Sequence, residues 1–235
     1  LLRGRADGED SSTRVPPRIS GSDYCLETWT SECETATALH VFPSEPFWRR
    51  AARPGTASRA ATCWRIAEAL ALRDIPTARP LALAEFRGDR LESCLATEHP
   101  RGAIPAIEFL NRLGARSDDS QSWLQTVRAL GRLLGRLHRW ELRHRRLHAR
   151  AVWLRADAEE VAAYFIDLVG IRIQRSLSPR ERAADLSQLA AWFPLDLRAD
   201  AELSEALGRA YLHAYRDAHG DWRELWPEVN HSPGR

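Results

Sequence analysis

The stretch "LRHRRLHARAVWL", residues 142–154, decides the fold because it joins a strong helix signal to a pair of short strands. Before it, apolar residues repeat with helical spacing and predict a long helix from Ser122 onward; they are Trp123, Val127, Leu130, Leu134 and Leu137. After its basic part, "AVWLR" and "AAYFIDL" predict two short strands joined by an acidic turn at 156–160. The stretch itself carries four arginines and two histidines but no carboxylate.

Upstream, the first half of the chain is rich in strand signals. Weak alternation and a high content of Thr, aromatic and β-branched residues in 23–42 predict two or three short strands that end at Phe42, before Pro43. Residues 79–98 predict two more strands around a turn at 87–89.

Between these strand regions lies one helix signal. Apolar residues with helical spacing predict a helix in 58–74, with Ser58 as its N-cap and an end before Pro76. The Pro- and Gly-containing segment 99–102 predicts a loop, which we interpret as a hinge between two halves of the protein.

The order of elements predicts the fold class. Residues 181–193 and 202–218 are typical of amphipathic helices, so helices dominate the second half. This order is that of an α+β, two-lobed, protein-kinase-like fold with a small β-rich N-lobe and a helical C-lobe. The expected divisions are a disordered lead at 1–20, an N-lobe at 21–98 and a C-lobe at 99–235.

The composition of the 235-residue chain, with 44% hydrophobic and 28% charged residues, is that of an ordinary globular protein. No run approaches the roughly 20 apolar residues of a membrane helix, and the start lacks the apolar core of a signal peptide. We therefore expect a cytoplasmic protein, free or peripheral to the inner membrane.

The chain has no lysine, which excludes enzymes that depend on a catalytic lysine. The four cysteines are Cys25, Cys33, Cys63 and Cys94. Their spacing matches neither a metal-binding pattern nor a redox C-x-x-C motif, so we expect free thiols.

The basic stretch also resembles a catalytic loop. Kinases carry the pattern His-Arg-Asp-Leu, then three residues, then Asn. Here His144, Arg145 and Leu147 match it, but Arg146 stands in the position of the Asp and Ala151 in that of the Asn. With "SRAATCWRIAEALALRDIPTARPLAL", "CLATEHPRG" and "YFIDLVGIRI…RAADLSQLAAWF", the chain resembles the bacterial lipopolysaccharide core kinases, the Kdo and heptose kinase family, over residues 35–215.

This resemblance implies roles for single residues. His40 stands in the position of the strand lysine that holds the phosphates, and Cys63 in that of the helix glutamate that pairs with it. Arg146 replaces the base that orients the attacking hydroxyl, and a guanidinium cannot accept a proton. Asp167 matches the metal-binding aspartate, and Asp185 matches an aspartate that supports the catalytic loop from the next helix.

Because four groups that a kinase needs are replaced together, the resemblance implies a pseudokinase, a binding or regulatory module with lost or much reduced phosphotransfer. ATP and Mg²⁺ are expected only where activity remains, with Glu98 as a hinge contact and Asp167 as the metal ligand. Because Arg146 and Asp167 occupy facing positions, we predict an ion pair between them in place of the metal. Only 17 residues separate Asp167 from Asp185 and there is no Gly-rich phosphate loop, so a nucleotide, sugar or lipid suits the cleft better than a folded protein. A protein partner elsewhere stays open.

One alternative is an active, atypical kinase that phosphorylates a lipopolysaccharide core sugar. In it, Arg49, Arg50 or Arg59 would hold the phosphates, and Glu68 or Asp157 would replace the missing acids.

A second alternative is nucleic-acid or anionic-lipid binding by a basic run made of Arg132, Arg136, Arg139, Arg143, Arg145, Arg146 and Arg150. Interleaved leucines favour instead a helix with one solvated basic face, which disfavours nucleic acid as a partner. His144 and His148 are four residues apart, as zinc ligands on a helix are, but no third ligand lies near them in the sequence. Tryptophans on apolar helix faces, such as Trp64, Trp123 and Trp192, are expected in the core.

Overall fold

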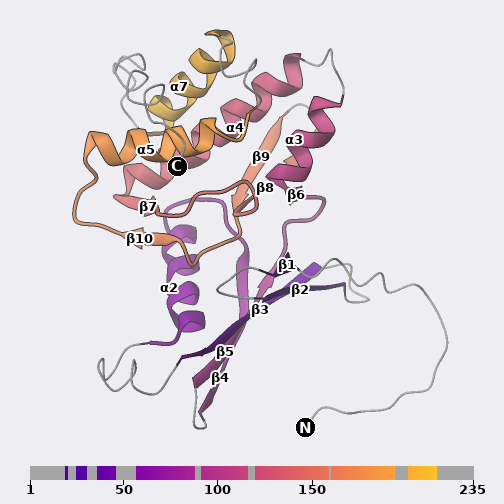
Figure 1. The fold of residues 1–235 in the computed structure, drawn as a ribbon, viewed down its shortest axis with the longest axis vertical. Coiled ribbons are helices and arrows are strands. Elements are labelled where there is room, and N and C mark those ends of the chain that lie inside the picture. The colour runs from indigo at the N-terminus through magenta and orange to yellow at the C-terminus, as the bar shows by residue number, and fades with distance from the viewer. Residues whose placement is uncertain are drawn as a thin grey trace, which may run out of the picture.

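The computed structural model describes residues 19–20, 25–30, 36–45, 57–87, 91–115, 120–158, 160–193 and 201–215. A strand-rich N-terminal half stands against a helical C-terminal half (Figure 1). The predicted α+β class with this division of strands and helices is confirmed. Of the predicted disordered lead, all but Ile19–Ser20 lies outside the described residues.

The N-terminal half is built on one antiparallel sheet with the strand order β1-β2-β3-β5-β4. Its strands are β1 (Ile19–Ser20), β2 (Cys25–Thr30), β3 (Ala36–Glu45), β4 (Arg79–Arg87) and β5 (Leu91–Glu98). The predicted β4–β5 hairpin is confirmed. The predicted strand end at Phe42 is wrong, because β3 continues to Glu45 and its register against β5 shifts between these two residues. Such an irregularity accommodates Pro43, which has no N–H to donate to the neighbouring strand.

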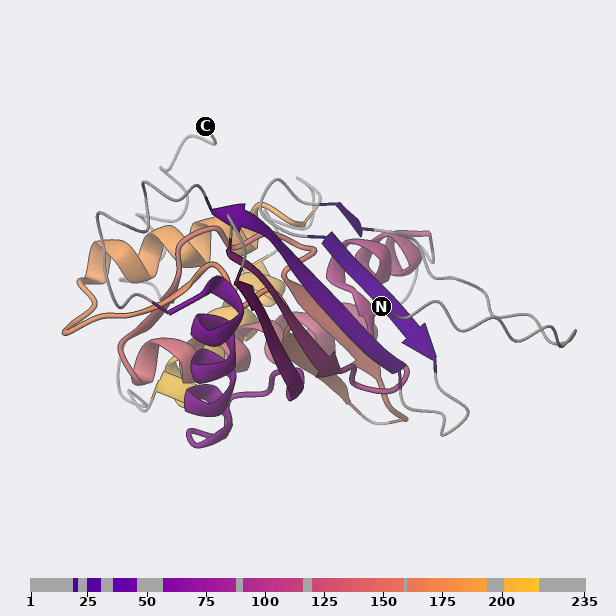
Figure 2. The same ribbon diagram turned by 90° about the horizontal axis from the view of Figure 1, so that it is seen from below.

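Helix α2 (Arg59–Ala71) covers one face of this sheet (Figure 2). The Ser58 side chain accepts a hydrogen bond from the Ala61 N–H at 3.0 Å, so the predicted N-cap is confirmed. The buried face of the helix carries Cys63, Ile66 and Leu70. Cys63 is therefore a buried residue of the N-terminal half.

In its described residues, the C-terminal half combines four helices with two small sheets. The described helices are α3 (Ala106–Gly114), α4 (Ser120–Arg139), α5 (Pro179–Ala190) and α7 (Ala201–Tyr215). One sheet has the order β6-β8-β9, and the other pairs β10 with β7. These strands are β6 (Ile104–Pro105), β7 (Leu142–His144), β8 (Val152–Ala156), β9 (Val161–Phe165) and β10 (Ile171–Ile173). The predicted β8–β9 hairpin is confirmed, whereas α3 and the β7–β10 pair had no sequence prediction.

Helices α4 and α7 lie side by side and form the centre of the C-terminal core (Figure 1). A Cβ atom added at Gly131 would lie 2.6 Å from the carbonyl oxygen of Leu207, and one added at Gly135 would clash with that of Tyr211. The two glycines therefore allow the backbones to approach more closely than larger residues would. The α4 stripe predicted from the sequence faces this core.

Candidate functional site: the loop at 142–151 and the buried Asp167

His40 lies on β3 with its side chain on the buried side of the sheet. Its Nε2 atom is 3.1 Å from the hydroxyl oxygen of Thr97 on β5. Burial lowers the pKa of His40 to about 4, against a smaller opposing effect of the negative charge on Asp167. The imidazole is therefore neutral near pH 7, and this position carries no cation for phosphate.

Cys63 lies on the buried face of α2 and is a free thiol. Burial raises the pKa of the Cys63 thiol to about 12, and the charge of Asp167 acts in the same direction. Arg172 and Arg59 oppose this effect, which shows that both cations lie within electrostatic range of the thiol. The two positions at which the resemblance implies a lysine–glutamate ion pair thus hold two neutral, buried groups.

The segment that follows α4 is not a helix. Helix α4 ends at Arg139, and residues 142–151 form strand β7 and a succession of turns. Leu147 and Ala151 point inward and are buried, and the carbonyl oxygen of Ala151 accepts hydrogen bonds from the backbone N–H groups of Ile166 (2.9 Å) and Asp167 (3.2 Å). The segment is therefore a rigid loop bonded to the chain around Asp167.

His144 fixes this loop from inside. Its buried ring has Nε2 at 3.0 Å from the carbonyl oxygen of Asp167 and lies nearly parallel to the Phe165 ring. Burial lowers the pKa of His144, so the ring is neutral and Nε2–H donates to that carbonyl. Gly170 lies against the ring, where a Cβ atom would approach His144 Nδ1 to 2.8 Å. The close packing orients Asp167 without involving its carboxylate.

The carboxylate of Asp167 is almost fully buried, with 9% of the side chain exposed. Its Oδ1 atom accepts a hydrogen bond from the Val169 N–H at 2.9 Å, and Oδ2 lies 3.6 Å from Nε2 of His148. Burial alone would raise the pKa of Asp167, but His148, His144 and the Val169 N–H together hold it below its ordinary value. Because His144 is neutral, the contact with His148 and the Val169 N–H carry this effect near pH 7. Asp167 is therefore an anion.

The predicted ion pair between Arg146 and Asp167 is wrong. Arg146 is exposed in the turn after β7, and the side chain that contacts the Asp167 carboxylate is His148, with its Nε2 atom 3.6 Å from Oδ2. The reason is the orientation of the loop: Leu147 takes the inward direction, so its neighbours Arg146 and His148 project outward, and His148 reaches the carboxylate. The sequence had drawn attention to His148 only as a zinc-like partner of His144.

Asp185 lies on α5 in a fully buried polar network. Its Oδ1 atom accepts a hydrogen bond from Nε of Arg143 at 2.9 Å, and its Oδ2 lies 3.2 Å from Nε2 of His138. Nδ1 of His138 lies 2.9 Å from the hydroxyl of Tyr211, and Arg143 also binds Glu181 at 3.2 Å. These bonds join α4, β7, α5 and α7 at the entrance of the loop.

The proton positions in this network follow from burial. Burial lowers the pKa of His138 and outweighs the opposing hydrogen bond and charge of Asp185. A neutral imidazole has one N–H, and a carboxylate only accepts, so Nε2–H donates to Asp185 and Nδ1 accepts from the Tyr211 hydroxyl. Asp185 thus supports the loop through the side chains of Arg143 and His138, a role for His138 that the sequence did not suggest.

Glu98 ends β5, and its carboxylate binds Arg79 on the neighbouring strand at 2.6 Å. The residue after it, His99, is buried against the Trp153 ring, with ring centroids 4.2 Å apart. Neither ring nitrogen of His99 has a hydrogen-bond partner within the described chain. Burial lowers the pKa of His99 to about 4, and nearby His40 adds to the effect. The structure thus brings His40 and His99 together, while Glu98 is held by Arg79.

The acids considered as replacements are engaged elsewhere. Glu68 accepts a hydrogen bond from Trp64 Nε1 at 2.8 Å, and Asp157 is bound by Arg155 at 2.9 Å in the β8–β9 turn. Arg49 and Arg50 lie outside the described residues.

Two further observations complete the site. Within the described residues, no three His, Cys, Asp or Glu side chains gather in a way that could hold a metal ion. None of the described helices combines the length and the apolar character needed to cross a bilayer.

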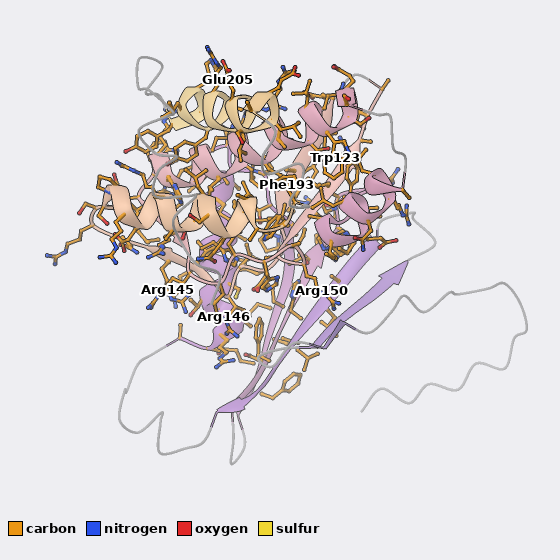
Figure 3. The ribbon with its side chains drawn as sticks, turned by 45° about the horizontal axis from the view of Figure 1, so that its top comes forward. Trp123, Arg145, Arg146, Arg150, Phe193 and Glu205 are labelled. Atoms are coloured by element: carbon orange, nitrogen blue, oxygen red, sulfur yellow. The ribbon has the colours of Figure 1, made fainter. Side chains whose placement is uncertain are left out.

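The tryptophans expected in the core lie there. Trp123 is buried in edge-on contact with Phe193 (Figure 3), and Trp64 and Trp192 are partly buried against the same core.

Comparisons with known proteins agree with this geometry. A family model described as the lipopolysaccharide kinase (Kdo/WaaP) family matches residues 48–215, which is more than half of the chain. A solved structure of WaaP in complex with acyl carrier protein is similar, with a TM-score of 0.62 and 17% sequence identity. The similarity covers 90% of this chain and 84% of that one, and it shows a shared fold. No curated protein matches the chain.

Proposed function

Because the chain belongs to the lipopolysaccharide kinase (Kdo/WaaP) family, we propose that it is a pseudokinase of that family, a binding or regulatory module without phosphotransfer. The observation that carries the proposal is the loop at 142–151, which presents Arg146 where the resemblance expects the base. Arginine keeps its proton at any physiological pH, so this side chain cannot activate a hydroxyl.

The charges around Asp167 support the same proposal. Phosphoryl transfer depends on cations that neutralise the phosphates and on metal ions held by oxygen ligands. His40 is neutral, and Ala151 offers no side-chain oxygen. Mg²⁺ requires a nearly octahedral set of oxygens, and here the carboxylate of Asp167 is already bound by the Val169 N–H and His148. These residues do not fit a resident Mg²⁺.

Phosphotransfer assays test the proposal. Purified protein is incubated with labelled ATP, Mg²⁺ and dephosphorylated lipopolysaccharide core, beside Asp167→Asn and the matched surface variant Asp157→Asn. We expect the three proteins to give the same background. Product that is lost in Asp167→Asn and kept in Asp157→Asn would establish instead the active, atypical kinase.

Thermal unfolding supplies a second readout. A ligand present at about 100 times its Kd and bound only to the folded state adds about 2.7 kcal/mol of stability. We expect the unfolding temperature to show no Mg²⁺-dependent response to ATP. A response that requires both Mg²⁺ and Asp167 would contradict the proposal.

Location and partners complete the proposed function. We propose that the protein lies in the cytoplasm, free or at the inner membrane surface. WaaP was solved with acyl carrier protein, and a protein partner for the present chain is compatible with a module that binds rather than transfers.

A further inference from the structure

A groove lies between helices α4 and α7, and we call it the α4–α7 groove. Its volume of about 620 Å³ is within the range of roughly 300–1,000 Å³ that small-molecule sites occupy. In Figure 3, Glu205 marks its α7 wall, on the opposite side of the helical half from Arg145 and Arg146. The groove shares no lining residue with the loop at 142–151 and is therefore separate from the site around Asp167.

Close backbone contact fixes the two walls of the groove. Gly131 of α4 lies against the backbone of Leu207, and Gly135 lies against that of Tyr211. A step of four residues along α4 thus matches a step of four residues along α7, so the two helices run in the same direction. Because the spacing of the walls is set before a ligand binds, the ordering cost of binding is low.

The α4 wall carries two arginines, Arg128 and Arg132. They are four residues apart, which places both side chains on the same face of the helix. Within the described part of the chain, no carboxylate oxygen lies within 4.0 Å of either guanidinium. Both guanidinium groups are therefore available to one anion in the groove.

The arginine one turn farther along α4 does not join this pair. Arg136 donates a hydrogen bond to the carbonyl oxygen of Asp74 at 3.3 Å, away from the groove. Arg132, in contrast, also borders a smaller cavity of about 150 Å³ against β9, whose lining includes Glu160. It thus stands half-buried between two cavities, where its position is restricted.

The charges on the α7 wall largely cancel. Arg209 binds Glu205, one turn before it, at 2.6 Å. Glu202 lies in the first turn of α7, at one end of the groove, and His213 lies in the last turn, at the other end. Three arginines against two glutamates leave the groove with one net positive charge when His213 is neutral.

The remaining lining residues are apolar: Leu124, Ala206 and Ala210. Burial of this surface by an apolar part of a ligand contributes to affinity. The groove is lined by nine residues, fewer than the roughly 20–30 residues that each side of a stable protein interface supplies. Its size therefore favours a small molecule over a protein partner.

From this arrangement we infer that the α4–α7 groove binds a small, free phosphomonoester with an apolar body. One guanidinium fork is enough for a carboxylate, whereas two guanidinium groups one turn apart match the larger charge and the three terminal oxygens of a phosphomonoester. Arg128 and Arg132 bind the phosphate, and Leu124, Ala206 and Ala210 contact the apolar body. The inference does not depend on the proposed function, because the groove lies outside the site around Asp167.

Titration calorimetry of the full chain with four compounds tests the inference: hexyl phosphate, glucose 6-phosphate, inorganic phosphate and hexan-1-ol. Hexyl phosphate combines the anion with an apolar body, and each of the other three lacks one of these parts. Wild type should bind hexyl phosphate at least about tenfold more tightly than each of the other compounds. Equal affinity for hexyl phosphate and any one of them would overturn the inference.

Two double variants with the same change of net charge locate the phosphate. Replacement of Arg128 and Arg132 by Gln should weaken the binding of hexyl phosphate at least about tenfold. The control replaces two exposed arginines near the start of α5, Arg175 and Arg180, by Gln and should change the affinity by less than about twofold. Equal loss in both variants would show that net charge alone is responsible and would contradict a site in the groove.

Two single variants test the apolar contacts. Ala206→Trp fills the groove and should weaken the binding of hexyl phosphate at least about fivefold while leaving that of inorganic phosphate unchanged. Leu124→Ala removes an apolar contact without adding volume and should weaken hexyl phosphate in the same direction. Wild-type affinity for hexyl phosphate in both variants, with folding confirmed by circular dichroism, would contradict the inference.

A membrane lipid is the other source of the same chemistry. Vesicles that contain phosphatidic acid present a phosphomonoester at a lipid surface, and we expect no sedimentation of the protein with them beyond that with neutral vesicles. Sedimentation that requires phosphatidic acid and is lost in the Arg128 and Arg132 double variant would assign the groove to a lipid surface. That result would contradict a free small molecule as the ligand.

Discussion

Replacement of Asp185 by Ala should destabilise the protein strongly, because Asp185 is fully buried between two donors. The variant leaves the Nε2–H of His138, which is also fully buried, without an acceptor, at a cost of about 1–3 kcal/mol. It also removes one charge-assisted bond from Arg143, whose side chain is 18% exposed and keeps its bond to Glu181, so this part costs about 1–2 kcal/mol.

Together these losses amount to about 2–5 kcal/mol, which overlaps the roughly 3–5 kcal/mol lost when one partner of a buried charge pair is removed. For a chain of this length, 1 kcal/mol corresponds to about 2–4 °C in Tm, so the unfolding temperature should fall by roughly 10 °C. Urea titration followed by circular dichroism measures the change in the free energy of unfolding.

Two controls sharpen this measurement. Asp185→Asn keeps the volume and one acceptor oxygen, so it should lose about half as much stability as Asp185→Ala. Asp157→Ala removes a 45% exposed partner of Arg155 and should cost less than about 1 kcal/mol. An Asp185→Ala protein within 1 kcal/mol of wild type would refute the reasoning, because the network would then contribute no more than a surface pair.

Gly170→Ala should cost about 1–3 kcal/mol in urea titration, since its Cβ meets a buried imidazole, whereas Gly114→Ala on α3 has no atom within 4 Å and should be neutral or stabilising; equal effects would contradict the packing. The free energy of unfolding should fall as the pH drops from about 6.5 toward 4, by about 1.4 kcal/mol per pH unit for each of His40 and His99. In this range the imidazoles are protonated in the unfolded chain but stay neutral in the folded protein, because burial lowers their pKa to about 4. Wild-type stability that is flat over this range, or a slope unchanged in His40→Gln, would show that these rings are not held neutral. Cys63 should resist alkylation at pH 8 in the folded protein and react like an ordinary cysteine in denaturant, as measured by mass spectrometry; fast labelling of the folded chain would disprove its burial as a neutral thiol.

Local patterns in the sequence predicted most of the regular structure. The α4 stripe and the Ser58 cap depend on neighbours within a few residues, and so do the two hairpins. The helix α3 was missed although its buried residues Ala106, Leu110 and Leu113 have helical spacing, because it is only nine residues long and so offers a short window for the pattern. The β7–β10 pair was missed because it joins segments far apart in the chain, and no local pattern encodes such a pairing.

The candidate site was predictable in its position but not in its contacts. Matching the sequence to a family pattern placed Arg146 on the loop and Asp167 beside it. Leu147 is buried in the core, and its inward direction sets the directions of its neighbours. Those directions decide which outward side chain reaches the Asp167 carboxylate. For this reason His148, and not Arg146, is the partner of Asp167. The link from His138 to Asp185 likewise joins two helices whose packing the sequence does not show.

The most direct test of the central claim is a single-turnover experiment with enzyme in excess over a dephosphorylated lipopolysaccharide core oligosaccharide, ATP and Mg²⁺. Mass spectrometry of the sugar then detects even one phosphate added per active site. With a guanidinium where a proton acceptor is needed, we predict that the sugar keeps its mass, in wild type as in Asp167→Asn. A phosphorylated sugar formed by wild type and absent with Asp167→Asn would contradict the claim.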